Sequence, residues 1–177
     1  MKRGMTLIEL MIVLSIIGIS IMLSIPSFAE LMQNYHYKTA ALALNNDIRF
    51  AKSTANQKKI RVSMCISSDQ IHCIAEASTQ WHKGWIIFFD PNNNFTPEPK
   101  NIIRQREARH SSVKINSSYN IQNGVQFNIG KKTGKSLGSG LPNGYFIICG
   151  QNKNAQKLIL NVYGRLRKEQ LSNCEDD

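Results

Sequence analysis

The N-terminal stretch MKRGMTLIELMIVLSIIGISIMLSIP (residues 1–26) decides the fold. Between Met5 and Ile25 it carries a single charged side chain, that of Glu9. A helix over this run is about 31 Å long, which matches the hydrocarbon core of a bilayer. Burying a carboxylate there costs free energy, so Glu9 predicts a cationic partner and a functional role. Pro26 marks the point where the helix bends or ends.

Three interpretations of this stretch compete. A secretory signal peptide would be cut after Ala29, but its apolar region is normally shorter than this one and lacks a residue such as Glu9. A plain membrane anchor explains the length of the run but not its charge. Third, residues 2–10 (KRGMTLIEL) resemble the class III leader of type IV pilins and type II secretion pseudopilins.

The resemblance to pilins and pseudopilins implies how the N-terminus is processed. A prepilin peptidase would cut after Gly4, and Met5 would become the N-methylated first residue, where the family usually has Phe. Glu9 would meet the N-terminal amine of a neighbouring subunit, which supplies the cation that a buried carboxylate needs. The family also implies a single pass through the inner membrane with the C-terminal domain in the periplasm, and then a place among other pilins in a fibre at the cell surface.

The rest of the chain divides into a helical and a β-rich part. Apolar residues recur at helical spacing in two series, 28–42 and 44–55, which predicts one helix from about Thr6 to about Asn56. Beyond Gln57, short β-branched and aromatic runs alternate with turn residues. The expected class is therefore α+β with an antiparallel β domain, and the family implies a type IV pilin-like fold. The expected strands are 60–66, 85–89, 102–106, 113–115, 125–129, 145–149 and 158–163.

These predictions divide the chain into four segments. They are a leader peptide (1–4), a transmembrane and assembly helix (5–26), the amphipathic part of the same helix (27–58) and a periplasmic or extracellular β-rich domain (59–177). Four cysteines allow three pairings, of which we favour Cys65–Cys73 and Cys149–Cys174 in an oxidising compartment. A metal site at Cys65, His72 and Cys73 is the weaker alternative, because no second pair of ligands has matching spacing.

Positive charge indicates a polyanionic partner. The chain has 22 Lys and Arg against 12 Asp and Glu, a formal net charge of +10. Residues 130–144 are expected to be a mobile basic loop that carries Lys131, Lys132 and Lys135. Nucleophile motifs and phosphate loops of the Walker type are absent from the sequence, so we expect neither enzymatic activity nor a cofactor or metal.

The segment Gly164-Arg165-Leu166-Arg167-Lys168 is the candidate binding motif. On an extended backbone Arg165 and Arg167 share a face, about 6.6 Å apart, and Leu166 points toward the core. Two guanidinium groups held in this way can each grip phosphate oxygens with two hydrogen bonds. The alternative is an edge strand whose charges prevent aggregation.

A second block, Trp81-His82-Lys83-Gly84-Trp85 with Phe88, Asp90 and Asn92, is similar to the W-x-x-G-W…F-x-D-x-N pattern of the FimT/GspH family of minor pilins and pseudopilins. FimT-type members implicated in natural transformation carry a C-terminal G-R-x-R motif that binds DNA. The resemblance implies DNA contact at Gly164, Arg165 and Arg167, and electrostatics extends the site to Lys168 and the loop lysines.

The resulting hypothesis is a minor pilin that binds double-stranded DNA without sequence preference and assists DNA uptake. Two alternatives stay open. One is a structural subunit without a DNA role, either an H-type pseudopilin or a pilus-priming subunit. The other is a secreted enzyme or adhesin with an ordinary signal peptide.

Overall fold

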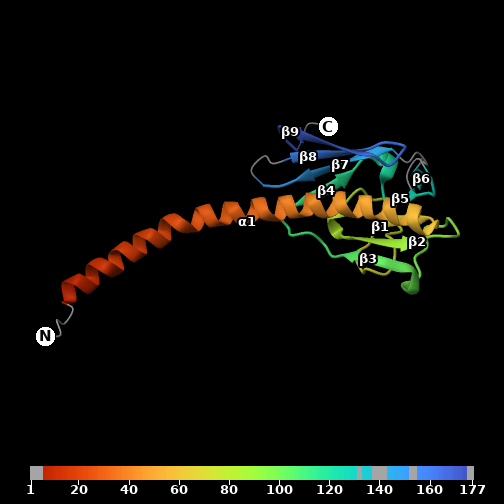
Figure 1. Cartoon of the computed structure of the whole chain (residues 1–177). Helices are drawn as coiled ribbons and strands as arrows, with labels where there is room; N and C mark the ends of the chain where they lie inside the picture. The colour runs from red at the N-terminus through yellow and green to blue at the C-terminus, as the bar shows by residue number, and fades with distance from the viewer. Residues whose placement is uncertain (1–5, 131–132, 137–142, 152–154, 175–177) are drawn as a thin grey trace.

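The computed structural model describes residues 6–130, 133–136, 143–151 and 155–174; at 23–27 and 133–136 it describes the backbone alone. One helix, α1 (Leu7–Lys58), starts at the N-cap Thr6, whose hydroxyl accepts the backbone N–H of Glu9 at 3.4 Å. It ends at Lys59, which adopts the left-handed conformation (φ 56°). The predicted single long helix is confirmed, and it continues through Pro26. Figure 1 shows its N-terminal half curving away from the β domain.

The N-terminal half of α1 leaves its apolar side chains exposed from Leu7 to Met22. Among the described residues, no helical stretch is both long and apolar enough to qualify as a membrane span.

The C-terminal half of α1 packs on the β domain through one face. Of the two predicted apolar series, the second is confirmed, since Leu44, Ile48, Ala51 and Ala55 are fully buried. The first series is helical as predicted, but its side chains Phe28, Met32, Tyr35 and Leu42 are exposed. The helix meets the β domain through a different face there, formed by Tyr37, Ala40 and Ala41.

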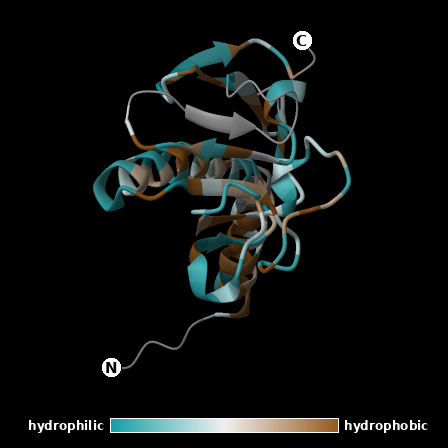
Figure 2. Cartoon of the chain, turned by 90° about the vertical axis from the view of Figure 1, so that its right-hand side faces the viewer, coloured by the Kyte–Doolittle hydropathy of each residue, from teal (hydrophilic) through white to brown (hydrophobic). Residues whose placement is uncertain are grey.

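The β domain consists of two antiparallel sheets that both contact α1 (Figures 1 and 2). One has the order β3-β2-β1-β5-β6 and the other β4-β7-β8-β9. Their bounds are β1 (Val62–Ile66), β2 (Trp85–Phe89), β3 (Ile102–Arg106), β4 (Lys114–Ser117), β5 (Gly124–Phe127), β6 (Thr133–Ser136), β7 (Gly144–Cys149), β8 (Ala155–Leu160) and β9 (Leu166–Leu171). The expected α+β class is therefore confirmed.

β6 was not expected, whereas β9 overlaps the segment 164–168, for which an extended backbone or an edge strand was considered. β6 lies within the segment predicted to be a loop, where it pairs with β5. β9 pairs with β8 along its whole length and forms one edge of the second sheet. Of the three loop lysines, Lys131 and Lys132 lie outside the described residues; Lys135 belongs to β6, where the backbone alone is described.

A buried carboxylate ties α1 to the first sheet. Asp47 is completely buried and accepts hydrogen bonds from Arg104 Nη1 at 2.6 Å, Arg106 Nε at 2.8 Å and the indole Nε1 of Trp85 at 3.0 Å. Burial raises the pKa of Asp47, but the hydrogen bonds from Arg106, Arg104 and Trp85 outweigh it and hold the pKa below its usual value. The helix is thereby held at a defined register on β2 and β3.

Both expected disulfides are present. Cys65–Cys73 closes the segment after β1, which takes these sulfurs away from the alternative metal site. Cys149–Cys174 connects the end of β7 to the chain just after β9, with 5.8 Å between the Cα atoms. Trp81 and Trp85 are fully buried in the core.

Candidate nucleic-acid interface

The candidate motif lies at the hairpin between β8 and β9. The side chain of Asn161 organises the turn, because its Oδ1 accepts the backbone N–H groups of Tyr163 at 3.0 Å and Arg165 at 2.9 Å. Gly164 has φ 67°, a conformation that favours glycine, and its N–H bonds to the carbonyl of Asn161 at 2.8 Å. The turn therefore holds Arg165 at a fixed place beside the first residue of β9.

The two arginines of the motif come together on the surface. Both side chains are exposed, and they line one hollow of about 570 Å³ together with Ile159, Asn161 and Leu166. Leu166 is half-buried and packs against the core, as expected from the alternation. Arg165 precedes β9 and Arg167 is its second residue, so the turn and the strand each position one guanidinium.

Arg167 already has a carboxylate partner. Its Nη2 lies 2.8 Å from Glu169 Oε2, two residues along the same strand, and the side chains are 74% and 46% exposed. This pair was not predicted, although residues two apart on a strand share a face. An exposed pair of this kind contributes little stability and is readily exchanged. Arg167 can therefore leave Glu169 for a phosphate.

Lys168 points away from the face of Arg167. In the pairing of β8 with β9, Lys168 is opposite Leu158 and Arg167 is opposite Ile159. Leu158 is buried, so Lys168 belongs to the face of the sheet that looks toward α1, although its own side chain is exposed. The expected extension of the site to Lys168 thus runs around the edge of the sheet, not along one face.

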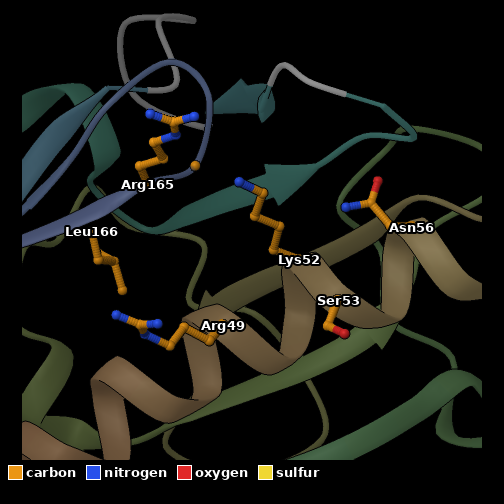
Figure 3. A pocket seen from close by; sticks show the side chains of 7 residues that line it. Arg49, Lys52, Ser53, Asn56, Arg165 and Leu166 are labelled. Atoms are coloured by element: carbon orange, nitrogen blue, oxygen red, sulfur yellow. The ribbon is translucent and has the colours of Figure 1, made fainter.

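Two cations of α1, which were not predicted as site residues, reach the same hairpin. Arg49 and Lys52 line a groove of about 460 Å³ with Ser53, Asn56, Gly164, Arg165 and Leu166. Lys52 Nζ donates to the carbonyl of Tyr163 at 2.5 Å. Figure 3 shows both helix side chains extending toward the segment that carries Arg165 and Leu166. Their spacing of three residues places them on one helix face, the signal that could have identified them.

Three arginines outside the motif are engaged elsewhere. Arg104 and Arg106 are bound to Asp47, and the guanidinium of Arg109 lies over the ring of Trp85, 4.9 Å from its centroid. These side chains belong to the packing of the domain, so the net charge of the chain does not by itself locate the candidate interface.

The N-terminal processing residues are only partly described. Gly4 and Met5 lie outside the described residues, and Glu9 is exposed in the first turn of α1. In the part of the chain that the structure describes, no group of three or more His, Cys, Asp or Glu side chains is placed to hold a metal ion. The chemistry available at the hairpin is the binding of anions.

Comparisons with known proteins identify two matching regions. Residues 40–164 match the family model described as type II transport protein GspH, and residues 1–25 match the prokaryotic N-terminal methylation motif. A comparison with curated proteins gives no match.

Solved structures extend this comparison to the fold. The crystal structure of the type IV minor pilin FimU from Pseudomonas aeruginosa PAO1 in space group P21 has a TM-score of 0.58 and 17% identity, covering 80% of this chain and 96% of that chain. The same protein in space group P65 gives a TM-score of 0.55 and 17% identity, covering 77% and 98%. At this identity the likeness shows the fold alone.

Proposed function

Because the chain belongs to the GspH family and is a minor pilin or pseudopilin of a type IV pilus or type II secretion system, we propose that it binds double-stranded DNA and assists DNA uptake. The observation that carries the proposal is the convergence of Arg165 and Arg167 on one exposed hollow. Each guanidinium presents several N–H groups in a planar fork that suits phosphate oxygens.

The proposed contacts are with the DNA backbone. Phosphate contacts hold a protein on a duplex, whereas sequence is recognised through base edges in the grooves. The candidate residues lie on a short hairpin and no recognition helix is seen among the described elements, so binding without sequence preference is expected. Affinities of about 10⁻⁴–10⁻⁶ M are typical of such binding, and about 4–6 phosphate contacts give a salt slope near −4 to −5.

We further propose that Gly4, Met5 and Glu9 have the roles implied by the family. A prepilin peptidase cuts after Gly4, Met5 is then N-methylated, and the carboxylate of Glu9 pairs with the terminal amine of a neighbouring pilin. Before assembly, residues 5–26 anchor the subunit in the inner membrane, with the β domain in the periplasm. The exposed apolar side chains of α1 support this proposal, because they require a cover of lipid or of other subunits.

A structural subunit without a DNA role is the second candidate. The Arg167–Glu169 pair favours it, because a charged edge strand also protects a sheet from pairing with another chain. The two candidates differ in one prediction: only the DNA-binding subunit needs Arg165 and Arg167 in order to bind DNA.

The test uses the full chain in non-ionic detergent and a DNA mobility assay. Arg165→Gln with Arg167→Gln should abolish the shift, because both phosphate contacts are lost. The matched control is Lys83→Gln with Lys114→Gln, which removes two exposed charges near the opposite edge of the same sheet, at β4. It should retain most of the shift, and circular dichroism should show all variants folded. Undiminished binding by the double arginine variant would refute the proposal.

A further inference from the structure

We propose that the groove between α1 and the β8–β9 turn is a second phosphate site, in which Arg49, Lys52 and Arg165 hold one backbone phosphate beside the one at Arg167. This inference rests on the proposed DNA binding and extends it to residues that lie far from the motif in sequence. It makes the helix part of the binding surface, not only its support.

The groove offers hydrogen-bond donors. Ser53 Oγ already accepts from Gln57 Nε2 at 3.1 Å, and Asn56 Oδ1 accepts the N–H of Gly130 at 3.1 Å. The hydroxyl proton of Ser53 and the amide N–H groups of Asn56 therefore remain to donate hydrogen bonds to a ligand. Lys52 gives one of its three ammonium protons to Tyr163 and keeps two. Such a lining is complementary to a ligand that only accepts hydrogen bonds, as a phosphodiester does.

The charges of the groove have one sign. None of the described residues that line it is acidic, whereas Arg49, Lys52 and Arg165 are cations from two separate elements. The pKa of Lys52 is lowered, first by burial and then by the positive charge of Arg165. Repulsion among these side chains costs free energy in the unbound protein, and an anion placed between them removes that cost.

The two proposed phosphate positions are connected through Arg165. This residue lines the helix-side groove with Arg49 and Lys52, and it also lines the hollow that contains Arg167. Gly164 lines the helix-side groove, where it is buried and has no side chain that would obstruct a ligand. A nucleic-acid backbone that follows the hairpin therefore passes from Arg167 over Arg165 to the helix. A single small anion would occupy only one of the two hollows. Two connected hollows therefore favour a nucleic-acid strand, which carries successive phosphates.

The test measures affinity for a short duplex over a range of salt concentrations, again with the full chain in detergent. Arg49→Gln and Lys52→Gln should each weaken binding about tenfold, because each removes one charge-assisted contact. Each should also make the salt slope shallower by about 1. Lys38→Gln removes an exposed charge from the same helix and should change neither quantity. Arg49→Gln is the decisive variant, because Lys52 also holds the turn through Tyr163.

The outcomes separate the two proposals. Wild-type affinity in Arg49→Gln, together with loss of binding in Arg165→Gln/Arg167→Gln, overturns the helix site and leaves the proposed function intact. If the unmodified chain fails to bind the duplex, the proposed function falls, and with it the helix site as a place for DNA. A tenfold loss in Arg49→Gln with an unchanged Lys38→Gln supports the site. Amide NMR signals of Gly164 and Arg165 that move when inorganic phosphate is added to unmodified chain, but not to Arg49→Gln, would support it independently.

Discussion

Arg167 and Glu169 form an ion pair on β9, the edge strand that also carries the proposed DNA contact. The carboxylate of Glu169 therefore competes with a DNA phosphate for the guanidinium of Arg167. Glu169→Gln removes that competition and one repulsive charge, so we expect DNA affinity to rise about three-fold, in line with the small strength of exposed pairs. Fluorescence anisotropy with labelled duplex measures the change.

The control for this variant is Glu98→Gln, which breaks a comparable exposed pair with Lys100, away from the hairpin. It should leave affinity within error of the unmodified chain. A fall in affinity on removing Glu169 would mean that the carboxylate positions Arg167 for DNA and does not compete with it.

The amino-acid pattern predicted strands that contain a β-branched or aromatic run more accurately than strands that lack one. The apolar run Trp85–Phe89 coincides with β2, and the segment Ile102–Arg106, which begins with two isoleucines, coincides with β3. β9, with the sequence LRKEQL, was anticipated only in part, as an extended backbone or an edge strand at residues 164–168, because its residues favour helices when taken alone. It becomes a strand because β8 offers its free hydrogen-bonding edge. The short polar β6 was missed because its sequence, TGKS, is typical of a loop.

The candidate site was predictable only where it is local in sequence. The arginines of the motif are two residues apart, so alternation alone brings them together. Lys52 and Tyr163 are 111 positions apart, and their contact depends on how α1 lies against the second sheet. The amino-acid sequence of one protein does not directly indicate how the helix lies against the sheet. The Arg167–Glu169 pair was within reach, and it was missed because the extended segment considered in the sequence ended at Lys168, one residue before Glu169.

Asp47 should be a major determinant of stability. Asp47→Asn leaves Arg104 and Arg106 without their buried counter-charge. Because these two side chains are 31% and 38% exposed, we expect a loss of about 2 kcal/mol of unfolding free energy, less than for a fully buried ion pair. Urea denaturation followed by circular dichroism measures this. Glu98→Gln again serves as the control and should change the unfolding free energy by less than about 0.5 kcal/mol. A similar small change in Asp47→Asn would contradict the proposed role of the buried pair.

The same carboxylate predicts how stability depends on pH. The pKa of Asp47 is lower in the folded protein than in the unfolded chain, where it is about 3.9. The unfolded chain therefore binds the proton more readily, and the stabilisation is complete above that value and declines as the pH falls below it. Denaturation at a series of pH values should show this decline in the unmodified chain and a smaller one in Asp47→Asn. Equal declines would assign the acid sensitivity to other carboxylates.

The Cys149–Cys174 disulfide should matter for DNA binding because it holds the end of the strand that carries Arg167. Cys174 lies just beyond β9, an edge strand supported on one side by β8, and the disulfide ties it to β7. Cys149→Ser with Cys174→Ser should let β9 fray, increase the hydrogen exchange of its amides and weaken DNA binding. Closing a loop of 25 residues contributes about 3 kcal/mol in the chain-entropy model, so unfolding should also become easier.

Cys65→Ser with Cys73→Ser removes the other disulfide, which is far from β9 in the strand order, and should lower stability without changing affinity. Equal DNA affinity in both double variants would show that the hairpin keeps its shape without the C-terminal link.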